Sequence, residues 1–586
     1  VAIGINGTTT SNILVDNFDN DVDYNDTPTS NYATLNPLNY ALATMSNANL
    51  AMRSSGSGAW QFRPASVGGQ STGKWYWEAR AVGSGSSLMA SIINDQYEKL
   101  NTSDVYPGQG AGVGTGGWSL YGANGRLYRN GVDQVASEGL AYGTDDILMF
   151  ALDLENGAWW AGQNGTWYKS ATTAEIEAGT TTNAIDTGTL SGEFWPGFVT
   201  QGSSANGWDV NFGQMPFIYT QPSGFNAWQT NNLPEPTIKD GKEHFEAIIW
   251  DGNDVDDRAI TTTEEFAPDL VWIKCRDSAI NHFIYDTVRG APNRLFPNLT
   301  NAEDAGAGHL KSFTSNGFTL GTSGNVNGTG NEYVAWCWKA GGTAVSNTDG
   351  TITSSVSANT DAGFSIVSYT GNLTAGATVG HGLTTAPDLI MVKSRDFAQT
   401  WHVKHSGVGN NTDSLSLDTS AAGINYNAWN NTAPGNSVFT LGPIDGTNKD
   451  TQTFIAYCWH SVEGYSKFGS YTGAGSGSAP DYNGTFVYLG FRPSWLLIKR
   501  SNAGGDPWIL LDSTRDTNNF AFRALQPDNS NLEVSSGDQF AIDFLSNGFK
   551  CRSSNAAINL SGASYVYMAF AENPFGGENA PPATAR

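Results

Sequence analysis

The feature that most constrains the fold of this chain is an internal repeat in its C-terminal part. Three segments of roughly 100–120 residues, a normal domain length, share one order of motifs. Each has a Pro-led apolar run that ends near a Lys, and each closes on an aromatic run. The first runs are PDLVWIKCRD from Pro268, PDLIMVKSRD from Pro387 and PSWLLIKRSN from Pro493, and the closing runs are EYVAWCWKAGG from Glu332, TFIAYCWHSVEG from Thr453 and SYVYMAFAENP from Ser564. The repeat predicts three homologous domains that share one topology, and we expect them to be independent sandwiches in series.

The composition predicts strands and tight turns throughout. Gly is abundant, with 69 residues, aromatic residues make up 12% of the chain, and charged residues make up only 15%. Such a profile suits short strands around aromatic cores. The clearest helical pattern is TAEIEA at Thr173–Ala178, capped by Thr172 or Thr173. We therefore predict an all-β chain of tandem, jelly-roll-like β-sandwich domains.

The repeat also sets the expected domain boundaries. Residues before the repeat form a separate large β-sandwich, followed by a Pro-rich linker. A stretch of small polar residues marks a second linker, between the first two copies. The expected segments are 1–220 (first sandwich), 221–241 (linker), 242–340 (first copy), 341–362 (linker), 363–464 (second copy) and 465–586 (third copy).

Charge and cysteine usage restrict the partners. A net charge of -25 repels phosphate backbones and anionic membrane surfaces, so we expect no nucleic acid partner. No run of 18 apolar residues exists, so we expect no membrane insertion. Cys337 and Cys458 recur at matched positions inside aromatic strands, which indicates small core residues rather than reactive thiols.

The sequence offers no arrangement of residues that predicts catalysis. Asp153 and Glu155 have the spacing of two carboxylates on one face of a strand, but the following Asn-Gly makes the site a hairpin turn. We expect no enzyme activity, no catalytic residues and no cofactor. Structural Ca²⁺ at the acidic loops Asp16–Asp26 and Asp251–Asp257 stays open, although the first loop lacks the residues of an EF-hand. Solvated loops are the simpler interpretation of both.

Two groups of aromatic and apolar residues are candidates for binding. Tyr426 and Trp429 lie in a loop and could stack on sugar rings, or could anchor that loop on its own domain. Phe225, Trp228 and Leu233 lie in the first linker, which has no obvious core of its own. We expect these three to contact other copies of the chain in an oligomer.

The part before the repeat resembles a SPRY domain, a concanavalin-like double-sheet sandwich. The order of the matching pieces over about 140 residues, within the size of one domain, carries this resemblance. The pieces are GKWYWEAR at Gly73–Arg80, NGRLYRNG at Asn124–Gly131, DDILMFALDLENGAWWAGQNGTWY at Asp145–Tyr168, FWPGF at Phe194–Phe198 and WDVNFGQMPF at Trp208–Phe217.

The repeats in turn resemble the β-rich modules that follow SPRY domains in tail fibres of marine phages. The matching phrases are NNLPEPTIKDGKEHFEA at Asn231–Ala247, WKAGG at Trp338–Gly342, FSIVSYTGN at Phe364–Asn372 and GHGL at Gly380–Leu383. This resemblance implies a virion tail fibre, a homotrimer among other virion proteins, that adheres non-covalently to a host surface glycan or protein receptor. A purely structural capsid fibre or adaptor, and a secreted carbohydrate-binding lectin or adhesin, are the alternatives.

Overall fold

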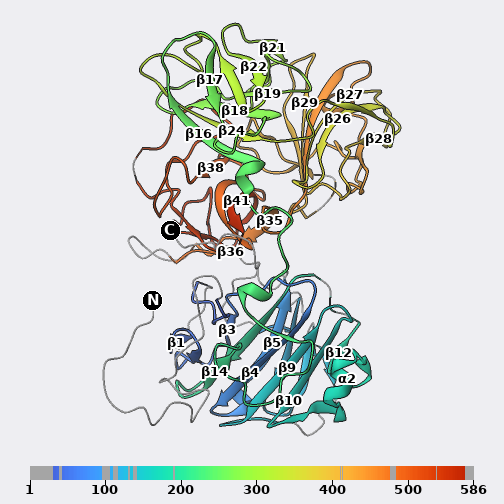
Figure 1. Ribbon diagram of the computed structural model, residues 1–586, viewed down its shortest axis with the longest axis vertical. Helices are drawn as coiled ribbons and strands as arrows, with labels where there is room; N and C mark the ends of the chain where they lie inside the picture. The colour runs from blue at the N-terminus through green and yellow to red at the C-terminus, as the bar shows by residue number, and fades with distance from the viewer. Residues whose placement is uncertain are drawn as a thin grey trace. The chain divides into compact units, whose positions relative to one another are not determined.

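The chain divides into two compact units in a computed structural model (Figure 1). The first unit spans Val1–Pro234 and the second Glu235–Phe575. The structure describes residues 31–38, 43–94, 106–109, 116–129, 132–135, 141–188, 190, 192–409, 411, 413–475, 483–535 and 537–574.

Two β-sheets packed face to face form the first unit. Phe198 of the second sheet lies 6.5 Å from Phe150 and 5.2 Å from Trp208 of the first sheet, measured between ring centroids. All three side chains are fully buried, so the sheets enclose an aromatic core. The first sheet runs β1-β2-β14-β4-β9-β10-β11, with β12 on β10 and β15 on β4, and the second runs β3-β13-β5-β6-β7-β8.

The strands of the first sheet are β1 (Thr44–Ser46), β2 (Ala51–Arg53), β4 (Lys74–Val82), β9 (Ile147–Asp153), β10 (Ala158–Gln163), β11 (Thr166–Trp167), β12 (Asp186–Thr187), β14 (Gly207–Asn211) and β15 (Asn226–Ala227). Those of the second sheet are β3 (Gln61–Pro64), β5 (Leu88–Asn94), β6 (Gly117–Tyr121), β7 (Arg126–Arg129), β8 (Val132–Val135) and β13 (Phe194–Thr200).

Helical segments in the described residues are short. The predicted helix is present as α2 (Thr173–Glu177), and Thr172 caps it: its Oγ1 accepts the backbone N–H of Glu175 at 3.2 Å, while the Glu175 carboxylate accepts the Thr172 N–H. The others are α3 (Asp445–Asn448) and the 3₁₀ turns η1 (Gly85–Ser87), η2 (Tyr168–Ser170), η3 (Thr181–Asn183), η4 (Thr230–Asn232) and η5 (Gly241–Glu243). The all-β prediction is confirmed.

Each copy of the repeat forms a main sheet and a smaller sheet. In the main sheet the opening strand pairs with the closing strand, and the closing strand pairs on its other side with the Pro-led strand. The Pro-led strand in turn pairs with the strand that follows it in the chain. The orders are β16-β24-β18-β19 in the first copy, β27-β34-β29-β30 in the second and β35-β41-β37-β38 in the third; the smaller sheets are β17-β23-β22, β28-β33 and β36-β40-β39. The expected common topology is confirmed for the main sheets, whereas, in the described residues, the smaller sheet of the second copy has two strands and those of the other two copies have three.

The first copy contains β16 (Phe245–Asp251), β17 (Arg258–Thr261), β18 (Leu270–Cys275), β19 (Phe283–Asp286), β20 (Asn293–Arg294), β21 (Asp304–Ala305), β22 (Leu310–Thr314), β23 (Gly317–Leu320) and β24 (Glu332–Trp338). The second contains β25 (Val345–Asn347), β26 (Ser354–Asn359), β27 (Phe364–Thr370), β28 (Ala377–Gly380), β29 (Leu389–Ser394), β30 (His402–His405), β31 (Asp413–Ser414), β32 (Ile424–Asn425), β33 (Val438–Leu441) and β34 (Thr453–Trp459). The third contains β35 (Ser466–Thr472), β36 (Phe486–Tyr488), β37 (Phe491–Arg500), β38 (Ile509–Asp512), β39 (Ile542–Leu545), β40 (Gly548–Cys551) and β41 (Ser564–Pro574).

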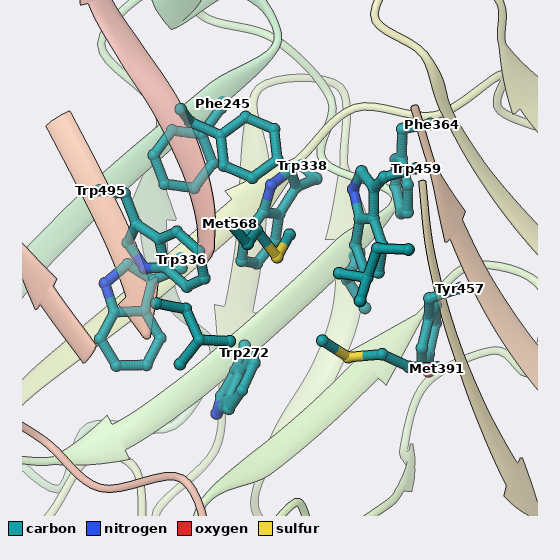
Figure 2. Close-up of a cluster of buried hydrophobic side chains, with 14 of the residues drawn as sticks. Phe245, Trp272, Trp336, Trp338, Phe364, Met391, Tyr457, Trp459, Trp495 and Met568 are labelled. Atoms are coloured by element: carbon teal, nitrogen blue, oxygen red, sulfur yellow. The ribbon is translucent and has the colours of Figure 1, made fainter. Parts of the chain in front are cut away.

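The three copies share one hydrophobic core, so the expectation of independent sandwiches is wrong. Figure 2 shows Trp338 of the first copy between Trp459 of the second and Trp495 of the third. Its ring centroid lies 6.3 Å from that of Trp459 and 5.7 Å from that of Trp495. The main sheets are therefore buried on both faces, one against the copy's own smaller sheet and one against the other copies.

Alternation along the closing strands produces these two buried faces. The residues facing the shared core are Val334, Trp336 and Trp338, then Ile455, Tyr457 and Trp459, then Val566, Met568 and Phe570. Those facing each copy's own core are Tyr333, Ala335 and Cys337, then Phe454, Ala456 and Cys458, then Tyr565, Tyr567 and Ala569. The prediction that Cys337 and Cys458 are core residues is confirmed, since neither is exposed.

Buried lysines at matched positions join the copies head to tail. Lys393 of the second copy donates from Nζ to the Thr300 carbonyl of the first at 2.7 Å. Lys499 of the third reaches the Ser420 carbonyl of the second at 3.3 Å, and Lys274 of the first reaches the Ser530 carbonyl of the third at 3.5 Å. The contact recurs at every junction, so the second unit is a closed pseudo-threefold ring.

Two of the three junctions add a buried ion-pair network. Arg289 pairs with Asp286, and Tyr457 of the next copy donates its hydroxyl to the same carboxylate at 2.7 Å. The junction between the third and first copies has the equivalent pair, Arg515 with Asp512, and there the Trp336 indole N–H replaces the tyrosine hydroxyl. At the remaining junction the matched residues are His405 and Val408, and His405 bonds instead to the Tyr567 carbonyl at 3.0 Å.

Both expected linkers contain strands. In the stretch 341–362, β26 pairs with β27 along its length and β25 pairs with β26, so this stretch extends the main sheet of the second copy. In the stretch 221–241, β15 pairs parallel with β4 of the first unit. A polar, Ser- and Thr-rich segment can form such edge strands because backbone groups supply the pairing.

Candidate functional site

The acidic residues considered for chemistry have structural partners. The Asp153 carboxylate accepts the backbone N–H groups of Glu155 and Asn156, both at 3.0 Å, and pairs with Lys74 at 3.2 Å. It therefore holds a hairpin turn together. Within the described ranges, no three His, Cys, Asp or Glu residues come together as a metal site would need.

One of the two acidic loops suggested for Ca²⁺ also has a structural partner for its carboxylates. In the stretch Asp251–Asp257, Lys311 pairs with Asp256 at 2.9 Å and with Asp257 at 2.7 Å, so a lysine occupies the place where a cation would be expected. The stretch Asp16–Asp26 lies outside the described residues.

None of the helices in the described ranges has the length and apolar character needed to cross a bilayer.

The residues expected to contact other copies are core residues of the first unit. Trp228 has no exposed surface and stacks on Trp75 at 4.6 Å between ring centroids. Phe225 and Leu233 are also buried, and Phe225 packs among residues of β4, β9 and β10. The premise that this segment lacks a core is wrong, because the chain folds back onto β4. These side chains offer no surface to an oligomer.

The loop of Tyr426 and Trp429 separates into an anchor and an exposed ring. Trp429 is fully buried in the core of the second copy, so it cannot stack on a sugar. Tyr426 is 38% exposed and lies edge-on to His402 at 5.3 Å. The structure thus favours the anchored-loop alternative for Trp429 and leaves Tyr426 as a single exposed ring.

A different group of aromatic side chains meets on the outer face of the second sheet of the first unit. Tyr121 ends β6, and Tyr128 lies on the neighbouring β7. Side chains alternate along a strand, so Leu120 and Leu127 point into the core and are buried while the two tyrosines point outward. Diagonal positions on paired strands lie close together, and the ring centroids of Tyr121 and Tyr128 are 6.2 Å apart.

Two further rings reach this face from loops. Trp60 precedes β3 and lies 6.2 Å from Tyr121. Tyr106 belongs to a turn that rests on the sheet, and this approach needs glycines: a Cβ on Gly117 would meet Pro107 at 2.4 Å, and one on Gly108, whose φ is +84°, would meet the Tyr128 carbonyl at 2.3 Å. Tyr106 lies 5.6 Å from Trp60 and 6.4 Å from Tyr128.

The four rings form a closed set, which we name the aromatic box: Trp60, Tyr106, Tyr128 and Tyr121. All four side chains are partly exposed. Partial burial, and then the neighbouring tyrosines, raise the pKa of Tyr106 and of Tyr121 above the ordinary tyrosine value, so these hydroxyls stay protonated at neutral pH. The Tyr121 hydroxyl donates to the Ser86 carbonyl at 3.1 Å.

Sequence reasoning missed the aromatic box because its members come from four separate segments. The usable evidence was Tyr121 and Tyr128 at outward positions beside buried leucines, and Trp60 in a loop of Gly and Ser. A partly exposed cluster of large aromatic rings is unusual, since such surface is normally buried unless it binds something. The aromatic box is therefore the candidate binding site.

Comparison with known proteins gives a family match and a number of structural neighbours. A protein-family model described as "Domain of unknown function (DUF7483)" matches residues 240–574. The SPRY domain of human HERC1 is similar over 33% of this chain and 99% of that domain, at 15% identity and a TM-score of 0.22. That TM-score is too low for the neighbour to support the fold, which rests on the two-sheet packing described above. A search of curated proteins finds no match.

Proposed function

The chain belongs to the family described as "Domain of unknown function (DUF7483)", and we propose that it is a component of a phage virion, a tail fibre that adheres to a host surface glycan. The aromatic box carries this proposal. Tyrosine and tryptophan offer a large rigid surface at low entropic cost, together with hydrogen-bonding groups at the ring edge. Adhesion by such a site is non-covalent and needs no catalytic group.

The resemblance of the sequence to fibres of marine phages supports the virion assignment. The pseudo-threefold ring supports a mechanical role, because a continuous core and buried contacts at each junction make the second unit rigid. A rigid body suits a protein that presents a binding site away from a particle. We further propose that the chain works as a homotrimer with other virion proteins, through surfaces other than Phe225, Trp228 and Leu233. Several copies would then strengthen weak binding by effective concentration.

An array of bacterial surface polysaccharides tests the adhesion proposal. The double variant Trp60→Leu/Tyr128→Leu removes two rings of the aromatic box while keeping apolar side chains. We expect it to lose at least about tenfold in binding, since each aromatic contact contributes on the order of 1 kcal/mol. The matched control is Tyr426→Leu, which removes an exposed ring of the second unit. Equal binding by the double variant and the control would contradict the assignment of the site.

Immunogold labelling of intact phage particles tests the virion proposal separately. Gold on tail fibres is expected. Gold on the capsid, with no polysaccharide binding, would favour a purely structural fibre or adaptor. Polysaccharide binding by a protein that never labels a particle would favour a secreted lectin or adhesin.

A further inference from the structure

Two of the three junctions of the ring contain a glutamate that bridges an arginine of each copy. At the junction between the first and second copies, Glu303 pairs with Arg289 of its own copy at 3.2 Å and with Arg395 of the next copy at 2.9 Å. The junction between the third and first copies has the matched set, with both pairs at 2.9 Å: Glu533, Arg515 and Arg276. A pair of buried opposite charges therefore adds to the hold of both junctions.

The junction between the second and third copies has uncharged residues or a histidine at all four matched positions, namely His405, Val408, Gly423 and Ser501. A backbone hydrogen bond that recurs at every junction fixes this match. The N–H of Gly423 donates to the Ser501 carbonyl at 3.1 Å, and its equivalents are Glu303 to Arg395 at 2.9 Å and Glu533 to Arg276 at 2.6 Å. The backbone contact is thus kept at this junction, while the ion pairs around it are replaced.

An acidic residue lies at this junction instead. Asp418 of the second copy stands between two residues whose carbonyls accept hydrogen bonds from the third copy. Ser416 accepts the Trp508 indole N–H at 2.9 Å, and Ser420 accepts from Lys499 Nζ at 3.3 Å. Asp418 is buried, so its carboxylate is withdrawn from water where the two copies meet.

The matched residue of the third copy is also an acid, Asp528, whereas that of the first copy is the neutral Asn298. Burial, together with the charge of Asp418, raises the pKa of the Asp528 carboxyl to about 6. Burial also raises the pKa of Asp418. The cations that act on these two carboxylates, Lys499 of β37 on Asp528 and Lys393 of β29 on Asp418, offset the shifts only in part.

These shifts fix the direction of a pH effect. A carboxyl whose pKa is raised in the closed junction favours closure while it is protonated, and this contribution is lost as the pH rises through that pKa. Ionisation then places two negative charges at the one junction whose matched positions lack the arginines. Rising pH therefore favours separation of the second and third copies.

The course of the chain allows such a separation to be reversible. Residues 460–465 alone connect β34 of the second copy to β35 of the third, whereas the first and third copies have no direct connection. A short tether keeps two surfaces at high effective concentration, so they can part and meet again in the same register. The junction that has the shortest tether is thus the one that lacks the ion pairs.

We propose that the ring opens between its second and third copies, about the link 460–465, and that Asp418 and Asp528 make this opening more frequent as the pH rises. The inference goes beyond the proposed function, because it adds a pH-sensitive hinge to an otherwise rigid unit whether or not the protein binds a glycan.

Hydrogen exchange of three matched backbone amides tests where the ring opens. The amides of Glu303, Gly423 and Glu533 each donate to a carbonyl of the neighbouring copy. We measure them in the full chain by mass spectrometry of short overlapping peptides, corrected for intrinsic exchange rates. The Gly423 amide should exchange at least about a hundredfold faster than the other two, because opening at their junctions must also break buried ion pairs. Equal protection of the three amides would overturn the proposal.

The same measurement at about pH 4 and about pH 8 tests the role of the two acids. We expect opening at Gly423 to increase at least about tenfold over this range, and the variant Asp418→Asn/Asp528→Asn to reduce the increase to less than about threefold. A loop that frays by itself would not respond to these substitutions. An unchanged pH dependence in the variant would therefore contradict the assigned role.

A gain-of-contact variant tests the missing ion pair. A Cβ on Gly423 would lie 3.6 Å from its nearest neighbours, an ordinary contact, so a side chain fits there. Gly423→Glu/Ser501→Arg rebuilds the matched pair and should slow exchange of the amide of residue 423 at least about fivefold relative to Gly423→Gln/Ser501→Arg, which keeps the side-chain sizes without the acid. Circular dichroism and the unfolding midpoint show that each variant is folded. Equal exchange in the two variants would refute the claim that absent ion pairs make this the junction that opens.

Discussion

The ion-pair network around Arg289 allows a quantitative test of the pseudo-threefold ring. The variant Arg289→Met keeps the length of an apolar side chain and removes the guanidinium. That group pairs with Asp286 and Glu303, at 3.2 Å for the latter, and donates to the Ile284 carbonyl at 3.0 Å and to the Tyr457 hydroxyl at 3.3 Å. Both Arg289 and Asp286 are fully buried at the side chain.

The size of the expected loss of stability depends on the partners that Glu303 and Asp286 keep in the Arg289→Met variant. Glu303 keeps its pair with Arg395 at 2.9 Å, so its charge stays compensated. Asp286 keeps the Tyr457 hydroxyl and one backbone N–H but loses its guanidinium partner. Breaking a buried pair by removing one partner typically costs about 3–5 kcal/mol, and because these hydrogen bonds remain, we expect a loss of about 3 kcal/mol.

Chemical denaturation of the whole chain measures this loss, and hydrogen exchange of peptides from β24 and β34 identifies the transition that belongs to the second unit. The control is Lys311→Met, which removes two exposed ion pairs and should cost at most about 1 kcal/mol. The double variant Asp286→Asn/Arg289→Met should be less destabilised than the single arginine variant, because it leaves no buried charge. A loss for Arg289→Met no larger than that of the control would refute the claim that this junction holds the ring together.

Four further outcomes are expected. Trp429→Ala should destabilise the second copy by about 3–5 kcal/mol, whereas Tyr426→Ala should cost about 0.5 kcal/mol or less, as read from unfolding midpoints. All four cysteines are buried, and burial raises their pKa values, so mass spectrometry should find no alkylation by iodoacetamide until the protein unfolds. Burial raises the pKa of the Asp528 carboxyl from 3.8 to about 6. The stability that this shift contributes is therefore fully present below about pH 4 and is lost as the pH rises through about 6. Asp528→Asn should stabilise the protein at pH 7 by at most about 3 kcal/mol, and denaturation at several pH values should show a stability that changes less across that window. Thr172→Ala should cost about 1 kcal/mol in the first unit, because it removes the cap of α2, and an unchanged unfolding midpoint would contradict that role.

The periodicity of the chain by itself determined the class of fold and the identity of its repeating part. The alternation of apolar and polar residues and the turn residues act over a few neighbouring positions, so they can be recognised without tertiary information. The capped helix at α2 and the core positions of Cys337 and Cys458 are of this kind. The matched order of strands in all three copies follows from the repeat as well, because similar sequences bury similar faces.

Only the tertiary structure decided which buried faces meet which. Trp336 and Cys337 are adjacent in a single apolar run, yet one lies in the shared core and the other in the core of its own copy. A strand that is buried on both faces has a continuous apolar sequence, and that sequence does not identify the element that covers its second face. For that reason the sequence does not predict the ring of three copies. The packing of Phe225 and Trp228 in the core of the first unit likewise depends on the chain folding back onto β4. The aromatic box depended in the same way on loops and strands far apart in the chain, since the register that brings Trp60, Tyr106, Tyr121 and Tyr128 together is set by packing and not by any local pattern.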